Sequence, residues 1–122
     1  MGEIEDFMIK AEEKLKVSKL LYEQEFYGDS VSSSYYVMFL VAKALLLKKG
    51  LNPKTHKGLI KQFNKEYVYE DNFDNSIYKD FVRTQSLRHQ ADYDSTDNIN
   101  QKIAKNKLIL AEKFIKEGKK FL

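Results

Sequence analysis

Residues 35–47 read YYVMFLVAKALLL and form the most apolar stretch of the chain, with Lys43 as their only charged residue. A helix that is apolar almost all round is expected to be buried and to contact several neighbouring elements. The stretch is too short to span a membrane, which needs about 20 such residues. It therefore predicts a buried central helix, which we place at Val31 to Lys49.

Amphipathic helical patterns lie on both sides of this stretch. No segment alternates with a period of two over a useful length, whereas a period of 3.6 recurs throughout. The first helix is predicted to run from about Glu3 to Phe26. Gly28 is expected to end it, and Asp29 or Ser30 to cap the central helix. The inward stripe of the first helix, about 80° wide on a helical wheel, consists of Ile4, Met8, Ala11, Leu15, Ser18, Tyr22 and Phe26.

Three further helices are predicted after the central one. Residues 48–50 (KKG) form a typical helix C-terminus. A short third helix is predicted from near Thr55 to around Tyr67, and a fourth from about Ser76 to Asp92. The fifth is predicted to start after a capping cluster at residues 94–97 (DSTD). Long helices with short connections predict an all-α fold, namely an up-and-down antiparallel helical bundle of about five helices (four long, one short), with residues 1–122 as a single domain.

The composition excludes several classes of protein. The chain has 21 basic and 18 acidic side chains and a net charge of +3, without the concentrated basic face of a dedicated nucleic-acid binder. It has no cysteine, which excludes disulfides and thiolate metal sites. The two histidines lie far apart without metal-ligand spacing, and no glycine-rich phosphate loop occurs, so neither a metal nor a cofactor is expected. The first residues, MGEIED, do not resemble a signal peptide, so we expect a cytoplasmic protein without a membrane segment.

Both arginines of the chain lie in one short segment, residues 81–93, which reads FVRTQSLRHQADY. All other basic side chains are lysines, spread over the whole length. Arginine has a planar fork of donors that binds carboxylates and phosphates bidentately and stays charged when buried. Arg83 and Arg88, beside His89, Asp92 and Tyr93, therefore mark this segment as the candidate functional site. A purely structural Arg–Asp pair is the alternative.

A helical wheel separates these five side chains. Arg88 falls in the middle of the apolar arc of the fourth helix, and Asp92, one turn on, is its expected partner. A guanidinium that faces a core or an interface must be paired and hydrogen-bonded. His89 and Tyr93 can share another face. Arg83 lies well away from the apolar arc, and it cannot converge with His89 within one straight helix.

A second candidate site is the start of the third helix, where Lys54, Thr55, His56 and Lys57 follow one another. Thr55 is the expected N-cap. Free backbone N–H groups, the positive end of the helix dipole and two lysines favour the binding of an anion such as phosphate. The alternative is a capped helix start with solvated lysines.

Three segments together resemble one known family. They are SVSSSYYVMFLVAKALLLKKGL (30–51), KTHKGLI (54–60) and SLRHQADY (86–93). In this order they are similar to the HEPN domain family (higher eukaryotes and prokaryotes nucleotide-binding), in particular its small stand-alone prokaryotic branch. The resemblance implies an antiparallel helical bundle, usually dimeric, that is often encoded beside a minimal nucleotidyltransferase in toxin–antitoxin pairs.

Many members of the family are metal-independent ribonucleases, whose motif is an arginine followed by four to six residues and a histidine. Two alignments of this motif compete. Arg83 and His89 fit the spacing literally, whereas the better local match aligns Arg88 with the family arginine and places Tyr93 at the histidine position. For a nuclease, the resemblance implies that His89 or Tyr93 polarises the ribose 2′-hydroxyl. Arg88 and Arg83 would stabilise the charge that develops on the phosphate.

The chain departs from the family pattern at two positions. Ser33 stands where relatives often have arginine before the tyrosine pair, and Leu40 where they often have histidine. Each change removes a polar group from the expected cleft. Tyr35 and Tyr36 could stack a base, although core packing is the expectation for them.

From these observations we expect an HEPN-type partner of a minimal nucleotidyltransferase that binds nucleotide or RNA phosphate in a cleft between two copies. Whether the chain is an enzyme stays open. A non-catalytic, dimerising assembly protein with a structural Arg–Asp pair is the first alternative. A metal-independent ribonuclease is the second.

Overall fold

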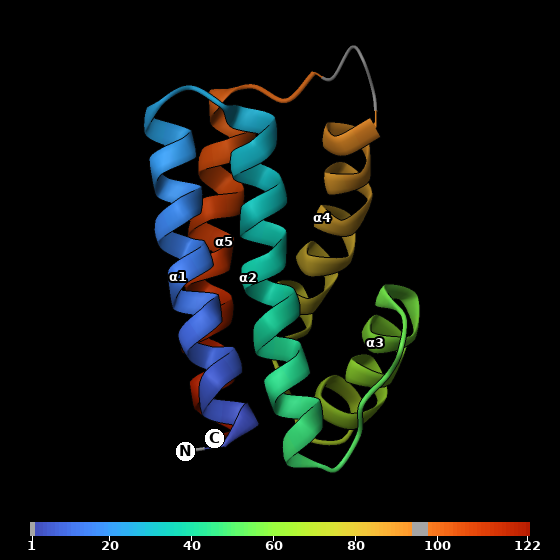
Figure 1. The fold of residues 1–122 in the computed structure, drawn as a ribbon. Helices are drawn as coiled ribbons and strands as arrows, with labels where there is room; N and C mark the ends of the chain where they lie inside the picture. The colour runs from blue at the N-terminus through green and yellow to red at the C-terminus, as the bar shows by residue number, and fades with distance from the viewer. Residues whose placement is uncertain (1, 94–97) are drawn as a thin grey trace.

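The computed structural model describes residues 2–93 and 98–122, and the regular structure of these residues is helical (Figure 1). The long helices are α1 (Glu3–Glu23), α2 (Tyr27–Lys48), α4 (Asn75–Tyr93) and α5 (Gln101–Lys119), and they alternate in direction. The short helix α3 (His56–Phe63) continues into a π-helical turn, η1 (Asn64–Tyr69). The all-α, up-and-down bundle predicted from the sequence is confirmed.

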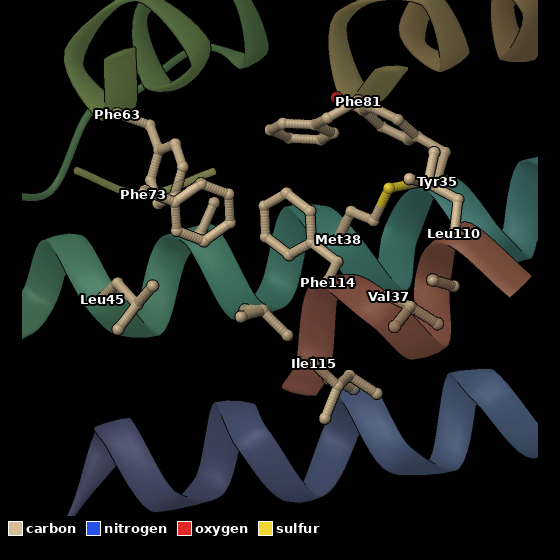
Figure 2. Close-up of a cluster of buried hydrophobic side chains, with 14 of the residues drawn as sticks. Tyr35, Val37, Met38, Leu45, Phe63, Phe73, Phe81, Leu110, Phe114 and Ile115 are labelled. Atoms are coloured by element: carbon tan, nitrogen blue, oxygen red, sulfur yellow. The ribbon is translucent and has the colours of Figure 1, made fainter. Parts of the chain in front are cut away.

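Helix α2 lies in the middle of the bundle, with α1 and α5 on one side and α3 and α4 on the other (Figure 1). By length and composition alone α2 could cross a membrane, but 72% of its most apolar window is buried inside the bundle. The predicted central helix is therefore confirmed, although it begins at Tyr27 and not near Val31. The side chains that α2 contributes to the core in Figure 2 include Tyr35, Val37, Met38 and Leu45.

Aromatic rings join the two sides of the bundle near its centre (Figure 2). The ring of Phe114 on α5 lies 5.0 Å from that of Phe81 on α4 and 5.1 Å from that of Phe73. Phe81 also stacks on Tyr35 of α2, with ring centres 5.7 Å apart. Tilted and edge-on contacts at these distances are favourable beyond the area they bury. They anchor α4 against α2 about two turns before Arg88.

The turn between α1 and α2 differs from the prediction. Helix α1 ends at Glu23, and Gly28 lies inside the first turn of α2. The chain reverses at Glu25, which has a φ of 66°. The Phe26 N–H donates to Leu21 O at 2.8 Å, which closes a helix end that glycine usually occupies. The prediction that Gly28 ends the first helix was wrong, because Glu25, three residues earlier, adopts the left-handed conformation.

Ser30, predicted as a possible cap, instead takes part in a buried hydroxyl cluster between α1 and α2. Its Oγ–H donates to Ser18 O at 2.9 Å, and the Ser18 hydroxyl lies 2.7 Å from that of Ser34. All three serines have no exposed surface. Buried hydroxyls must be hydrogen-bonded, and these satisfy one another while their small size lets the two helices approach closely.

The other helix ends agree better with the sequence. Gly50 has a φ of 77° directly after α2, as the predicted C-terminus requires. Thr55 caps α3 as predicted, since its side chain accepts a hydrogen bond from the Gly58 N–H at 2.9 Å. The cap of α5 is Asn100, whose side chain accepts from the Ile103 N–H at 2.9 Å. The capping cluster predicted at residues 94–97 lies outside the described residues.

Candidate functional site

Arg88 lies on the inner side of α4, as the helical wheel predicts, with only 14% of its side chain exposed. Its Nη1 donates to Oδ2 of Asp92 at 2.9 Å, one helical turn on. The other oxygen of Asp92 accepts from the Ser32 hydroxyl of α2 at 3.0 Å. Asp92 therefore holds the guanidinium and ties the C-terminal part of α4 to α2.

The guanidinium of Arg88 lies over two tyrosine rings of α2. Its Cζ is 5.3 Å from the centre of the Tyr35 ring and 5.4 Å from that of Tyr36. Guanidinium groups stack on aromatic faces better than ammonium groups because they are planar and weakly hydrated. This contact explains why an otherwise lysine-rich chain has arginine at this position.

Two buried polar atoms beside this contact have no hydrogen-bond partner among the described residues. They are Nε of Arg88 and Oε1 of Gln85, three residues earlier on α4. Buried polar groups without a partner are rare in folded proteins, and they often point to a bound water, ion or ligand. The arrangement thus offers a positioned cation with an unused donor.

His56 belongs to the same cluster, and the sequence did not predict this. Its Nδ1 lies 2.9 Å from the Tyr35 hydroxyl, and its ring stacks on Phe39 with centres 4.2 Å apart. Burial lowers the pKa of His56 below its ordinary value of 6.5, and the charges of Arg88 and Lys43 lower it further. His56 therefore stays neutral at pH 7.

The predicted grouping of residues 54–57 needs correction. Lys54 and Lys57 are exposed, whereas the His56 ring packs against α2. The helix start is capped by Thr55, but its histidine contributes to the Arg88 cluster and not to a surface with the two lysines. The reason is the position of His56 as the first residue of α3, from which its side chain reaches the aromatic rings of α2.

The remaining candidates lie on the outer surface of α4. His89 contacts Tyr93 edge-on at 4.7 Å, and these two line a shallow depression with Ser86 and Gln90. Arg83 is 68% exposed and pairs with Asp80 at 2.8 Å, one turn back. Within the described residues, Arg83 and His89 of the literal motif therefore contact different side chains, Asp80 and Tyr93, and not each other.

Sequence reasoning overlooked Lys43 as a site residue. Its Nζ lies 5.2 Å from the centre of the Phe7 ring, and its charge is close enough to lower the pKa of His56. The available signal was its place as the only charge in the apolar stretch. No group of three histidine, cysteine, aspartate or glutamate side chains in the described part of the chain could hold a metal ion.

Comparison with known proteins agrees with this arrangement of helices. The HEPN domain matches residues 4–121. The chain belongs to the HEPN family. Two proteins of Methanocaldococcus jannaschii, each described as a candidate toxin, are both 39% identical to this HEPN chain over 120 residues. The matches cover 98% of the chain, and 82% and 89% of the two relatives respectively.

A solved structure from Thermus thermophilus has the same fold as this HEPN chain. The TM-score is 0.83, and the match covers 100% of both chains at 14% sequence identity. Such a low identity supports the arrangement of helices and not a shared activity. The family resemblance inferred from the tyrosine pair, KTHKGLI and SLRHQADY is confirmed by the domain match over residues 4–121.

Proposed function

We propose that this HEPN protein is the toxin-like member of a two-component pair whose other member is a minimal nucleotidyltransferase. In this proposal it acts in the cytoplasm as a homodimer and binds a nucleotide or RNA phosphate at Arg88. The observation that carries the phosphate site is the guanidinium itself, which is held over two tyrosine rings and whose buried Nε has no hydrogen-bond partner in the described part of the chain. The description of the two archaeal relatives as candidate toxins supports the assignment to such a pair.

The outer face of α4 supports the dimer. Its exposed residues Val82, Ser86, His89, Gln90 and Tyr93 carry no formal charge, with histidine counted as neutral, and their helical spacing places them on one stripe of the helix. Val82 is 36% exposed and Tyr93 is 75% exposed. A neutral face with apolar and aromatic side chains suits a symmetric contact between two copies. Such a contact would bring His89 and Tyr93 of both copies close to one another.

The phosphate site is tested by binding of adenosine 5′-monophosphate and of a ten-residue uridine RNA. Arg88→Lys keeps the charge but removes the planar fork, so we expect it to weaken binding at least about tenfold. Arg83→Lys is the matched control and should bind like the wild type, because Arg83 is exposed and lies apart from the cluster. Equal binding by wild type and Arg88→Lys contradicts the phosphate role.

The dimer is tested by sedimentation equilibrium at micromolar concentration. His89→Glu would place a like charge in both copies at the centre of the neutral face, so it should shift the protein to monomers. Lys16→Glu, on an exposed position of α1, should leave the dimer intact. A wild type that sediments as a monomer contradicts the dimer.

The two-component pair is tested by the neighbouring gene. A minimal nucleotidyltransferase gene is expected beside this gene, and its absence contradicts the proposed pair.

A second function is favoured by one observation. Asp92 joins Arg88 to Ser32, so the same bridge can serve purely to fasten α4 to α2. In that case the chain is a non-catalytic assembly protein that dimerises and positions its partner enzyme. Loss of stability without loss of nucleotide or RNA binding in Arg88→Lys would favour this second function.

A further inference from the structure

We infer that His56, and not His89, is the histidine that serves the Arg88 site, where it binds the phosphate group of a nucleotide or RNA through an Nε2–H donor. The inference rests on the proposed function and adds to the site a residue from a different helix. It makes the phosphate site a feature of a single protomer, assembled from α2, α3 and α4.

Two tyrosines bring His56 and Arg88 to the same place. The Tyr35 ring stacks on the His56 ring at 5.8 Å and lies 5.3 Å from Cζ of Arg88. The Tyr36 ring lies 5.9 Å from His56 and 5.4 Å from Cζ of Arg88. Because both rings contact both groups, the imidazole and the guanidinium belong to one cluster that is built from α2, α3 and α4.

The hydrogen bond to Tyr35 selects the tautomer of His56. The Tyr35 side chain is fully buried, and burial raises the pKa of its hydroxyl far above the ordinary value of 10, so the hydroxyl keeps its proton. His56 Nδ1 is the hydrogen-bond partner found for this hydroxyl in the described part of the chain. A buried donor needs an acceptor, so the hydroxyl donates to Nδ1. The proton of the neutral imidazole is then on Nε2, where it can be donated to a ligand.

The surroundings of His56 hold this donor in a fixed orientation beside positive charge. Phe39 and Tyr35 stack on the ring at 4.2 Å and 5.8 Å. Lys43 and Arg88 both lie close enough to lower the pKa of His56, and the ring is still partly exposed. A rigid donor with two cations near enough to act on it is suited to phosphate oxygens.

His89 has none of these features. It is exposed on the outer face of α4, and its described ring contact is with Tyr93, which is 75% exposed. It therefore lies apart from the two tyrosines that hold Arg88. Because Arg88 and His89 are consecutive residues of one helix, their side chains point to different faces of it.

The tautomer is tested on the full chain labelled with ¹⁵N, by long-range ¹H–¹⁵N correlation at pH 7.5. The expected result is a His56 imidazole with its proton on Nε2, and a loss of this preference in Tyr35→Phe. A proton found on Nδ1 overturns the inference. This readout is independent of any ligand.

The binding role is tested with adenosine 5′-monophosphate and the ten-residue uridine RNA. His56→Phe keeps the stacked ring and removes the donor, so it should weaken binding about tenfold. His56→Gln keeps a donor near Nε2 and should retain most of the affinity, whereas His56→Leu, which also removes the donor, carries the test if His56→Phe does not fold. His89→Phe is the matched control and should bind like the wild type. The probe that loses affinity in His56→Phe identifies the source of the phosphate.

Two results separate this inference from the proposed function. If Arg88→Lys weakens binding and His56→Phe does not, the role of His56 is overturned and the phosphate site at Arg88 stands. If neither Arg88→Lys nor His56→Phe changes the binding of either probe, both proposals are overturned.

Discussion

The guanidinium of Arg88 lies over the face of the buried Tyr35 ring, with its Cζ 5.3 Å from the ring centre. The hydroxyl of the same ring is hydrogen-bonded to His56. Tyr35 therefore has a structural role, because it is fully buried in the core, and it also joins the two polar groups of the candidate site. A change at any of the three residues should affect both stability and binding.

Loss of the Arg88 side chain should destabilise the protein more than loss of the other arginine. Arg88→Ala removes a stacked cation and leaves Asp92 without its guanidinium, which should lower the free energy of unfolding by about 2–4 kcal/mol. Arg88→Lys should recover only part of this loss, because the planar fork is absent. Arg83→Ala should change it by less than about 0.5 kcal/mol, since that side chain is 68% exposed. Urea unfolding of the three variants measures these differences, and equal effects of the two alanine substitutions would contradict the semi-buried role of Arg88.

Ribonuclease activity is expected to be weak or absent. A general acid–base group typically contributes about 10²–10⁴-fold in rate, and a phenol such as that of Tyr93 is a poor substitute for an imidazole in proton transfer at neutral pH. The measurement is metal-free incubation with structured and unstructured RNA. Strong cleavage that both His89→Ala and Arg83→Ala abolish would establish the literal motif as catalytic. Cleavage that survives both and is lost in Arg88→Ala or Tyr93→Phe would place the chemistry on the other alignment.

Stability should fall as the pH is lowered through the range of histidine titration. The pKa of His56 in the folded protein lies below its ordinary value of 6.5 because of burial and the charges of Arg88 and Lys43. As the pH falls, the unfolded chain therefore takes up a proton at His56 more readily than the folded chain does. The stability that the neutral His56 contributes is complete above pH 6.5 and declines below it. Thermal melts at pH 7.5 and 5.5 should show a lower melting temperature at pH 5.5. His56→Gln should reduce that difference, and an unchanged difference would show that His56 is not its source.

A glycine at position 25 should stabilise the protein. Glu25 has a φ of 66°, a conformation that costs a residue with a side chain about 1 kcal/mol or more. Glu25→Gly removes this cost, and we expect a gain of about 0.5–1 kcal/mol. Glu23→Gly, within α1, is the matched control and should lose about 1 kcal/mol. A loss of stability in both variants would contradict the strained turn.

The sequence by itself determined the class of fold and the family. Helical periodicity and the apolar stretch at residues 35–47 are local properties, and they were enough to predict an all-α bundle around a buried central helix. The Arg88–Asp92 pair was predictable for the same reason, because residues one turn apart on a helix are neighbours whatever the rest of the chain does.

Only the tertiary structure decided which side chains gather around Arg88. His56 joins the cluster from another helix, and Tyr35 and Tyr36 reach it from α2. These contacts depend on how three helices pack, and no spacing along the chain encodes them. The turn at Glu25 was missed for a related reason, since the packing of α1 against α2 stabilises a backbone conformation that the residue type alone does not favour.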